Sequence, residues 1–564
     1  MSRTITKNLS GMLPDDALAA LAGAIGEAVA SRYPGSAAPD VAFEAPRRTE
    51  FGDFSTNVAF GLAKAARRSP ADIAADLVAE IGRSAPNVAA LFSALDAVGG
   101  FINLRCAPVV WQTLVAAILR DGKSFGRSSA RAGRVSLEFG SANPTGPLVV
   151  VQGRTLSIGD TLAKALRYCG YDVFVEWIVN DYGSQMDTLG RSLYARYVQQ
   201  FRPAFPFPEE GYPGEYLLPL ARAVADRDGD RWLDAVQDRW LPYFAQYGRD
   251  SLLAEQQATA ARFGVAFDLW QSESELHASG RVEEDLAKLA SMGLTYECDG
   301  AVFFRTTSFG DDKDRVLRRS DGRPTYLAPD VTYHYEKFQR ADRVIDILGP
   351  DHHGYIERLN AVAAAMGYPG KLDVLIAQQI TLMRGTEQVS MSKRAGNIVT
   401  LDDILDEVGI DAARFFFIML AAESPLTFDL KLATEASNEN PVYYVQYGHA
   451  RIASVLKNAS GEDAARARDG NSLQVLEHSA ELALVRRLAE LPRAVRGVVE
   501  NLAPHRLAKY ARDVASDFHQ FYTECKILTE DREVRTARLG LCIATQNVLA
   551  TVLDLIGVSA PESM

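Results

Sequence analysis

The sequence of 564 residues predicts a multidomain protein with an α/β N-terminal domain, a central doubly wound parallel sheet that carries an insertion, and an all-α C-terminal domain. Its length suggests three or four domains, because a domain usually has about 100 to 200 residues. From residue 133, strand and helix patterns alternate as a doubly wound parallel sheet requires. After residue 436 the pattern is helical, with few prolines and apolar residues three or four positions apart.

The first block of the chain alternates helical segments with short β-like runs. An early helix is indicated by apolar residues at helical spacing, namely Leu18, Leu21, Ile25 and Val29. Ser69 and Pro70 predict the N-cap and the first residue of an amphipathic helix. The run GGFINLRC, residues 99–106, predicts a strand that closes a small α/β domain.

The central block begins with a strand–loop–helix–strand pattern. VSLEFG (135–140) predicts a strand, SANPTGP (141–147) a turn-rich loop, Val150 to Tyr168 a helix, and DVFVEWIV (172–179) a second strand. Ligands of such sheets bind at the carboxyl ends of the strands. The loop after Phe139 is therefore a candidate binding site.

Residues 186 to about 265 interrupt this pattern with aromatic-rich sequence and several helical runs, which predicts an insertion between two halves of the sheet. β-rich sequence then resumes in four stretches: AVFFRTTSF (301–309), YLAPDVTYHY (326–335), VIDILGPDHHGY (344–355) and LDVLIAQQITLM (372–383). It ends at the loop SMSKRAGN, residues 390–397.

Composition excludes some classes of protein and permits others. The net charge of −12 comes almost entirely from residues 126–435, which carry 33 basic and 44 acidic residues, so the near-neutral outer blocks permit nucleic-acid binding. We see no secretory signal and no stretch near the roughly 18 continuous apolar residues of a membrane span, and expect neither insertion nor export. We find no metal-ligand constellation. Five scattered cysteines predict reduced, buried thiols: Cys106, Cys169, Cys298, Cys525 and Cys542.

Several ordered stretches together resemble a class I aminoacyl-tRNA synthetase, specifically the bacterial arginyl-tRNA synthetase family. The core stretches are SANPTGPL, LGPDHHGY and SMSKRAGNIVTLDD, with FGDDKDRVL and DGRPTYLAPDVTYH between them. RTEFGDFSTNVAFGLAK resembles the family's N-terminal RNA-binding domain, and SNENPVYYVQYGHARI with GVSAPE resembles its anticodon-binding helices. The resemblance implies a tRNA-binding additional domain (1–125), a Rossmann-type class I catalytic domain (126–435) and an anticodon-binding domain (436–564).

The resemblance also implies the reaction and its partners. The family activates L-arginine with ATP, releases pyrophosphate, and transfers the arginyl group to the 3′ end of tRNA-Arg. Its members generally need tRNA present for the activation step. We therefore expect ATP with Mg²⁺ as a substrate, no tightly bound cofactor, no membrane association, and a monomer in the cytoplasm.

Charge that builds up on the phosphates must meet donors that are already in place. By resemblance, Ser392, Lys393 and Arg394 close over the phosphates, although Ser390 stands where the family motif usually begins with lysine. The family positions expected to bind ATP are Pro144, Gly146, Gly153, Gly349, Asp351, His352, His353 and Met391. For the basic loop taken alone, a solvated surface loop is the competing interpretation.

The chain departs from the family at its histidine-bearing signature. Val149, Val150, Val151 and Gln152 stand where the family has two histidines, with a glycine before the second. Gln152 keeps an N–H donor but carries no charge, and Val151 places a branched side chain where adenine would rest. The loss of one donor to the transition state costs about 10²- to 10³-fold in rate. The groups expected to replace the two signature histidines are the amides at the start of the helix, Arg154, and the pair His352 and His353. In another interpretation this pair caps or packs locally.

An arginine pocket needs acids in fixed geometry, because a guanidinium is planar and always charged. The resemblance assigns arginine binding to Glu138, Ser141, Asn143, Tyr326 and Asp330. A neutral competitor would leave a buried acid unpaired, at a cost of about 3 to 5 kcal/mol. For Glu138 alone, a salt-bridged strand end is the competing interpretation.

Basic residues and aromatics on the late helices predict contacts with tRNA. We expect anticodon bases to stack on exposed aromatics while arginines meet phosphates, with Arg486, Arg493, Arg506 and Tyr510 as candidates. A solvated charged face is the competing interpretation.

Three hypotheses remain open from the sequence. The first is an active arginine–tRNA ligase with an altered phosphate loop, favoured by Lys393, Glu138, Asn143 and Asp330. The second is a non-catalytic paralogue that binds arginine or tRNA in a regulatory role, favoured by the altered run 149–152. The third, a class I synthetase for another amino acid, is disfavoured by the acidic pocket.

Overall fold

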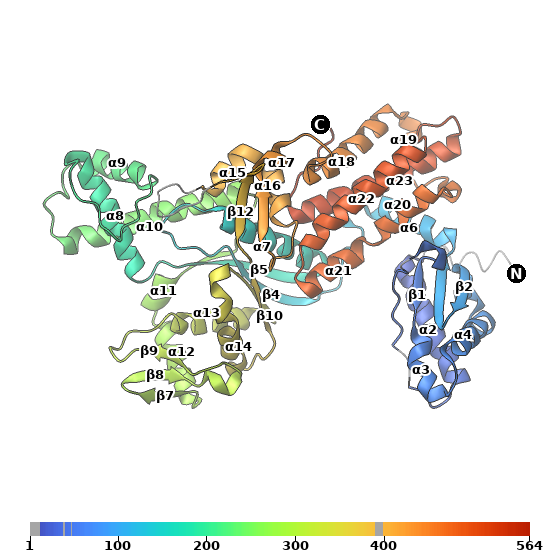
Figure 1. Cartoon of the computed structure of the whole chain (residues 1–564), viewed down its shortest axis with the longest axis horizontal. Helices are drawn as coiled ribbons and strands as arrows, with labels where there is room; N and C mark the ends of the chain where they lie inside the picture. The colour runs from blue at the N-terminus through green and yellow to red at the C-terminus, as the bar shows by residue number, and fades with distance from the viewer. Residues whose placement is uncertain (1–11, 38–39, 47, 390–398) are drawn as a thin grey trace.

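The structure, a computed structural model, describes residues 12–37, 40–46, 48–389 and 399–564. A small domain at the N-terminus stands beside a long bundle of C-terminal helices, and the central region lies on the other side of that bundle (Figure 1). Ser390, Met391, Ser392, Lys393 and Arg394 lie outside the described residues.

The N-terminal domain is a three-stranded antiparallel sheet covered by helices. Its strands pair in the order β1–β3–β2, with bounds Phe54–Thr56, Phe101–Cys106 and Phe92–Val98. The helices are α2 (Pro14–Arg32), α3 (Val58–Ala66), α4 (Pro70–Ser84) and α5 (Pro86–Ala89). The Ser69 hydroxyl accepts from the Asp72 amide, so the predicted N-cap is confirmed.

The central sheet is parallel and has the order β11–β10–β4–β5–β6. The strands are β4 (Gly133–Phe139), β5 (Tyr171–Val179), β6 (Leu269–Ser272), β10 (Arg343–Leu348) and β11 (Leu372–Ile376). Helix α7 (Val150–Tyr168) joins β4 to β5. Strand β4 pairs with β5 on one side and with β10 on the other. The chain connections from β4 and β10 therefore run in opposite directions, and a topological switch point lies between these two strands.

Two additions flank this sheet. The insertion consists of α8 (Ser184–Phe201), α9 (Leu217–Asp228) and α10 (Gln237–Arg262), which project together on the far left of Figure 1. A second unit has α11 (Glu273–Ala278), α12 (Arg281–Ser291), α13 (Leu327–Arg340), α14 (Ile356–Ala365) and the antiparallel strands β7 (Thr295–Cys298), β8 (Ala301–Phe304) and β9 (Arg315–Arg318).

A small mixed sheet and short helices lead from the central sheet to the bundle. They are β12 (Ile380–Arg384), β13 (Glu387–Gln388), β14 (Leu426–Asp429), α15 (Leu401–Val408), α16 (Ile410–Phe417) and α17 (Leu430–Thr434). The bundle has α18 (Pro441–Asn458), α19 (Gly461–Arg468), α20 (Ser479–Ala489), α21 (Leu491–Asn501), α22 (His505–Glu524) and α23 (Arg532–Ile556).

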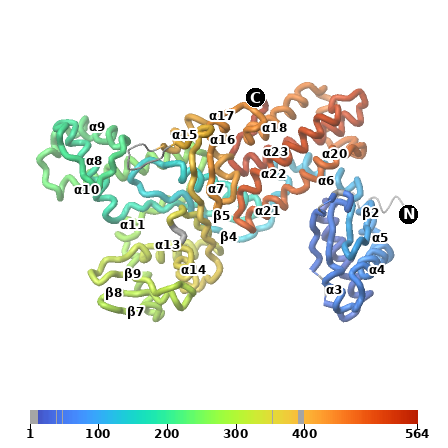
Figure 2. The backbone as a smooth tube through the Cα atoms, in the orientation of Figure 1, coloured from blue at the N-terminus to red at the C-terminus, as the bar shows by residue number. Residues whose placement is uncertain are grey.

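The structure corrects two details of the sequence-based description, and it shows where α6 packs. The β-rich stretch 326–335 is helical, because Leu327, Val331 and Phe338 of α13 share one buried face. Helix α6 (Pro108–Asp121) packs against α20 and α23, among the C-terminal helices in Figure 2. The Cys298 thiol is exposed rather than buried.

Within the described residues, one helix would pass as a membrane span by length and composition alone. It is α23, and 83 % of its most apolar window is buried inside the protein. The sequence estimate overlooked it because scattered Thr, Gln and Asn residues break its apolar run. Its apolar residues pack against α6, α18, α19 and α22.

A buried arginine joins the central region to the bundle. The Arg414 guanidinium donates to the carbonyls of Ile556 (3.0 Å) and Phe263 (2.9 Å) and forms an ion pair with Asp160 of α7. Its side chain is 1 % exposed. The ends of α23 and α10 and the middle of α7 therefore meet at one side chain.

We expect Arg414→Met to destabilise the protein by about 3 kcal/mol, because it leaves Asp160 and two buried carbonyls without their donor. Lys164, 2.9 Å from Asp160, keeps the loss near the low end of the range for buried pairs. Urea unfolding followed by tryptophan fluorescence measures the effect. Arg120→Met is the matched control, since Arg120 and Asp121 form an exposed pair. Equal unfolding midpoints for the two variants would contradict the assignment.

Candidate functional site

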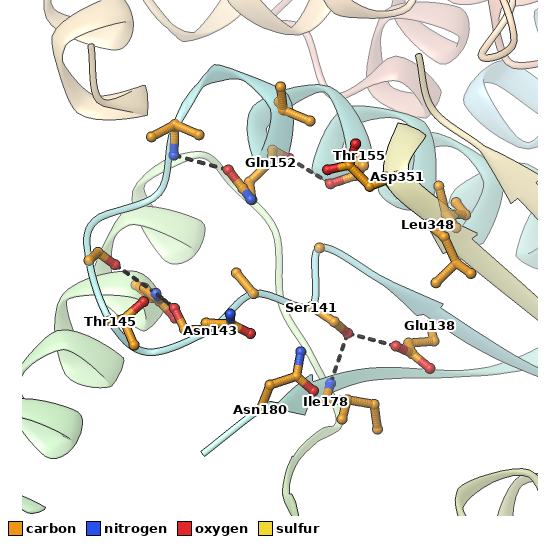
Figure 3. A pocket seen from close by; sticks show the side chains of 18 of the residues that line it. Glu138, Ser141, Asn143, Thr145, Gln152, Thr155, Ile178, Asn180, Leu348 and Asp351 are labelled. Carbon is orange, nitrogen blue, oxygen red and sulfur yellow. Dashed lines mark hydrogen bonds between the residues drawn. The ribbon is translucent and has the colours of Figure 1, made fainter. Parts of the chain in front are cut away.

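A cavity of about 890 Å³ opens at the topological switch point. Its wall includes residues from the carboxyl ends of β4 and β10, from the loop 140–147, and from the first turn of α7. Figure 3 shows Glu138 and Leu348 on one side and Gln152 with Thr155 above them. Among the described residues, the wall contains no lysine or arginine. Its carboxyl groups are Glu138, Glu273, Asp330, Asp346 and Asp351.

Glu138 is the last acid of β4 and is held on both oxygens. Its Oε1 accepts from the Ser141 hydroxyl at 2.8 Å, and Oε2 pairs with the ammonium of Lys337. The Ser141 Oγ in turn accepts from the amide of Ile178 at 3.0 Å (Figure 3). Ser141 therefore ties the end of β4 to β5 and fixes the direction of the carboxylate.

A buried network behind the cavity balances the charge of two of these acids. Lys337 is fully buried, and its ammonium lies 2.8 Å from Asp346, which also meets Nε2 of His334 at 2.8 Å. Burial raises the pKa of Asp346, but Lys337 and His334 outweigh it and hold this pKa well below its usual range. Burial raises the pKa of Glu138, and Lys337 only partly offsets that effect. Glu138 therefore already has a cation.

Asp330 and Glu273 have no lysine or arginine ion-pair partner in the described part of the chain. Burial, reinforced by neighbouring acids, raises the pKa of Glu273 to about 7 and that of Asp330 to about 6. Glu273 has His277 at 3.8 Å, and burial lowers the pKa of that histidine. The charge of Asp330 contributes to the raised pKa of Glu273, so this end of the cavity is suited to a cation.

Further polar groups lie around these two acids. The Tyr333 hydroxyl is buried in the cavity wall and has no hydrogen-bond partner among the described residues. Asp181 accepts from the Ser274 amide at 2.9 Å and fixes the start of α11, which places Glu273. Glu273 follows the end of strand β6, so the rule that located the loop after Phe139 also points to it. Tyr326 also lines the cavity, with 68 % of the residue exposed.

The altered signature forms the first turn of α7. Val149 is the N-cap and offers no side-chain acceptor, and its amide donates to Oε1 of Gln152 at 3.2 Å. Val149, Val151 and Gln152 all line the cavity, whereas Val150 is buried behind them. The Gln152 side chain folds back toward the helix start in Figure 3, and its Nε2 is left as a donor.

Arg154 is not a substitute for the missing histidines. Its guanidinium is fully buried and donates to the carbonyls of Gln378, Ala421 and Ser424, each at 2.9 Å. Burial lowers the pKa of Arg154 to about 10. Residues two apart on a helix point to nearly opposite faces, which is why Arg154 turns away from the cavity that Gln152 lines.

The remaining predicted ATP residues divide into three groups. Gly146, Gly349 and Asp351 line the cavity, as does Asn143 of the arginine set. Pro144 is buried outside the wall, and Gly153 is a packing position, since a Cβ there would come within 2.7 Å of Leu401. The side chains of His352 and His353 lie outside the described part of the structure.

The predicted tRNA residues occupy mixed positions. Arg486 pairs with Asp53 at 2.6 Å and Arg493 with Asp15 at 3.1 Å, so both face the N-terminal domain. Tyr510 is 4 % exposed and its hydroxyl donates to the Arg487 carbonyl at 2.8 Å, so its ring offers no face to a base. The helical pattern could not distinguish paired or buried residues from exposed ones, because it does not show what packs against a given face of a helix. Arg506 is exposed on the bundle.

Three family profiles match the chain. They are the arginyl tRNA synthetase N terminal domain at residues 18–106, the tRNA synthetases class I (R) catalytic domain at 244–419, and the DALR anticodon binding domain at 445–564. An arginine–tRNA ligase of Syntrophotalea carbinolica is 45% identical over 93% of this chain and 95% of its own length. One from Heliobacterium modesticaldum is 43% identical over 93% and 94%. The structure of Thermus thermophilus arginyl-tRNA synthetase has a TM-score of 0.74 at 23% identity, covering 97% of this chain and 100% of its own.

Proposed function

The chain belongs to the arginyl-tRNA synthetase family and is an arginine–tRNA ligase, and we propose that it activates arginine through a phosphate site in which uncharged donors replace two histidines. The observation that carries this proposal is the division of the cavity. One end holds two acids that have no lysine or arginine partner among the described residues, and the other end is the start of a helix with uncharged side chains at 149–152.

We assign the guanidinium of arginine to Asp330 and Glu273. A guanidinium supplies the charge that both carboxylates lack, and it donates in a plane that matches them. The Tyr333 hydroxyl is a buried acceptor in the same wall. Glu138, which Lys337 already neutralises, together with Ser141, Asn143 and Tyr326, then shapes the rest of the arginine site.

We assign the phosphates of ATP to the start of α7. The arginine carboxylate attacks the α-phosphorus, forms arginyl-adenylate and expels pyrophosphate, and the 3′-terminal ribose hydroxyl of tRNA later displaces AMP. Negative charge on the phosphates meets Nε2 of Gln152 and the first-turn amides of α7, whose dipole is positive at this end. Lys393 and Arg394, which lie outside the described residues, are the proposed cations.

The metal, the tRNA contacts and the assembly complete the proposal. ATP enters with Mg²⁺ as its counter-ion, so the metal arrives as part of the substrate. The near-neutral N-terminal block and the C-terminal bundle bind tRNA, with Arg506 as an exposed candidate. Ion pairs from Asp53 and Asp15 to Arg486 and Arg493 hold these two regions together. We expect the protein to work as a monomer in the cytoplasm.

Arginine-dependent exchange between pyrophosphate and ATP tests the activity directly. We expect exchange only when cognate tRNA is present, and we expect Lys393→Ala to lower it by at least about 10²-fold because a phosphate cation is lost. No exchange under either condition, with arginine and tRNA still bound, would instead identify a non-catalytic binding protein. Undiminished ligation by Lys393→Ala would remove this lysine from the site.

A second prediction concerns the altered signature. The double variant Val151→Gly with Gln152→His should raise the rate constant for activation by about tenfold or more, because an imidazolium donates to the phosphates with charge. The KM for ATP should fall as the valine side chain leaves the wall. Pre-steady-state formation of arginyl-adenylate measures the rate. An unchanged rate constant and an unchanged KM would show that neither position faces ATP.

A third prediction concerns pH. Free Glu273 and Asp330 are partly protonated near neutrality, because burial raises their pKa values to about 7 and about 6, and bound guanidinium favours their ionised forms. Arginine binding should therefore release protons, and should strengthen as pH rises through the window from about 6 to 7 and level off above it. Calorimetry in buffers of different ionisation enthalpy counts those protons.

Glu273→Gln is the matched variant for the pH prediction. It should weaken arginine binding and reduce proton release, and the remaining pH dependence should centre near the lower pKa, that of Asp330. Affinity that stays constant from about pH 6 to 8 in the unaltered protein would overturn the assignment of both acids.

A further inference from the structure

The insertion holds the loop that carries the substrate residues. Gln256 of α10 is 1 % exposed, and its Nε2 donates to two backbone carbonyls of that loop, Asn143 at 3.0 Å and Gly146 at 2.8 Å. A single amide group therefore spans the turn between these residues. The bonds join segments that lie more than a hundred residues apart in sequence, so they are not part of the packing of the insertion itself.

A second residue of the insertion holds the carbonyl between them. The Tyr216 hydroxyl donates to Thr145 at 2.7 Å, and a Cβ on Gly146 would come within 3.3 Å of the same phenol. Burial raises the pKa of Tyr216 to about 12, so the group remains a donor at neutral pH. Three carbonyls of the loop thus accept from two side chains of one insertion.

Helix α10 also contacts α15. One turn beyond Gln256, the Thr259 hydroxyl lies 2.5 Å from Asp402, and Arg262 pairs with Asp402 at 2.6 Å and Asp406 at 2.5 Å. Both acids belong to α15, whose first amide, that of Leu401, donates to the Leu148 carbonyl at 2.7 Å. Helix α10 therefore connects the loop 143–146 to α15, which packs beside α7.

We propose that Gln256 and Tyr216 are positioning residues for arginine activation: they fix the backbone of residues 143–146, and so direct Asn143 and the first turn of α7 toward the substrates. The inference rests on the proposed function, because it assigns these groups a role in that reaction. Neither side chain is required to touch the reacting atoms. Displacing bound groups by about 1 Å can cost 10²-fold in rate, so a loop freed from this contact should lose substrate affinity and rate together.

The variants Gln256→Met and Tyr216→Phe remove the donors while preserving side-chain size. Matched controls lie in the same insertion and do not contact the loop. Gln199→Met removes an amide that donates to the Phe205 carbonyl at 2.9 Å, and Tyr194→Phe removes a hydroxyl that donates to the Trp232 carbonyl at 3.2 Å. Each control therefore loses a comparable hydrogen bond.

The test measures tRNA-dependent pyrophosphate exchange for the full-length protein and the four variants. Gln256→Met should raise the KM values for ATP and arginine by about tenfold and lower kcat, and Tyr216→Phe should do the same by about threefold. The controls should leave both KM values within about twofold. A purely structural role would lower the active fraction, and hence the maximal rate, with both KM values unchanged.

Three outcomes would overturn the inference. The first is unchanged KM values and kcat in both loop-directed variants, the second is a lower maximal rate with both KM values unchanged, and the third is an equal change in the controls. If the unaltered protein shows no exchange, the proposed function fails. Calorimetric measurement of arginine binding then tests the inference separately, because Asn143 lies in the turn that Gln256 and Tyr216 hold and Ser141 lies just before it. Weaker binding by Gln256→Met than by Gln199→Met would then support the positioning role, and equal binding would refute it.

Discussion

Two buried guanidinium groups fix the orientation of α7, and the rest of the site depends on that helix. Arg154, on the side opposite the cavity, binds three carbonyls of the segments after β11 and α16, while Asp160 pairs with Arg414, which reaches the ends of α10 and α23. Breaking either contact would leave buried charge or carbonyls unpaired, which is costly. The helix is therefore held from residue 153 onward, independently of what occupies its first turn. The signature at 149–152 can differ without loss of the fold.

The electrostatics of the cavity favour our assignment of arginine and of the phosphates to different parts of the chain. Lys337 and His334 offset Glu138 and Asp346 from behind, whereas Asp330 and Glu273 have no lysine or arginine ion-pair partner among the described residues. A cavity wall with this charge attracts a guanidinium and opposes a triphosphate. We therefore propose that cations for the phosphates come from outside the described wall, with Lys393 and Arg394 as the candidates from this chain.

The sequence predicted the parallel sheet, α7 to its last residue and the loop after Phe139, because periodicity and strand-end rules are local. It missed α13, where aromatic and β-branched residues suggested a strand although the buried face follows helical spacing. It missed Glu273, Lys337 and Gln256 because their roles depend on partners far along the chain. Arg154 and Tyr510 were assigned to ligands for the same reason: a helical pattern shows that a face exists but not what covers it.

The valines at 149–151 and the glutamine at 152 act together at the start of α7. A valine N-cap offers no oxygen to the orphan amides of the first turn, and here the side-chain carbonyl of Gln152 accepts from the Val149 amide instead. This contact fixes which end of the side-chain amide faces outward, since only Nε2 remains available. The side-chain amide of Gln152 therefore has two roles. Its Oε1 stabilises the start of α7, and its Nε2 offers a donor to the cavity. A histidine at this position could carry a positive charge, whereas Gln152 offers the cavity a neutral donor.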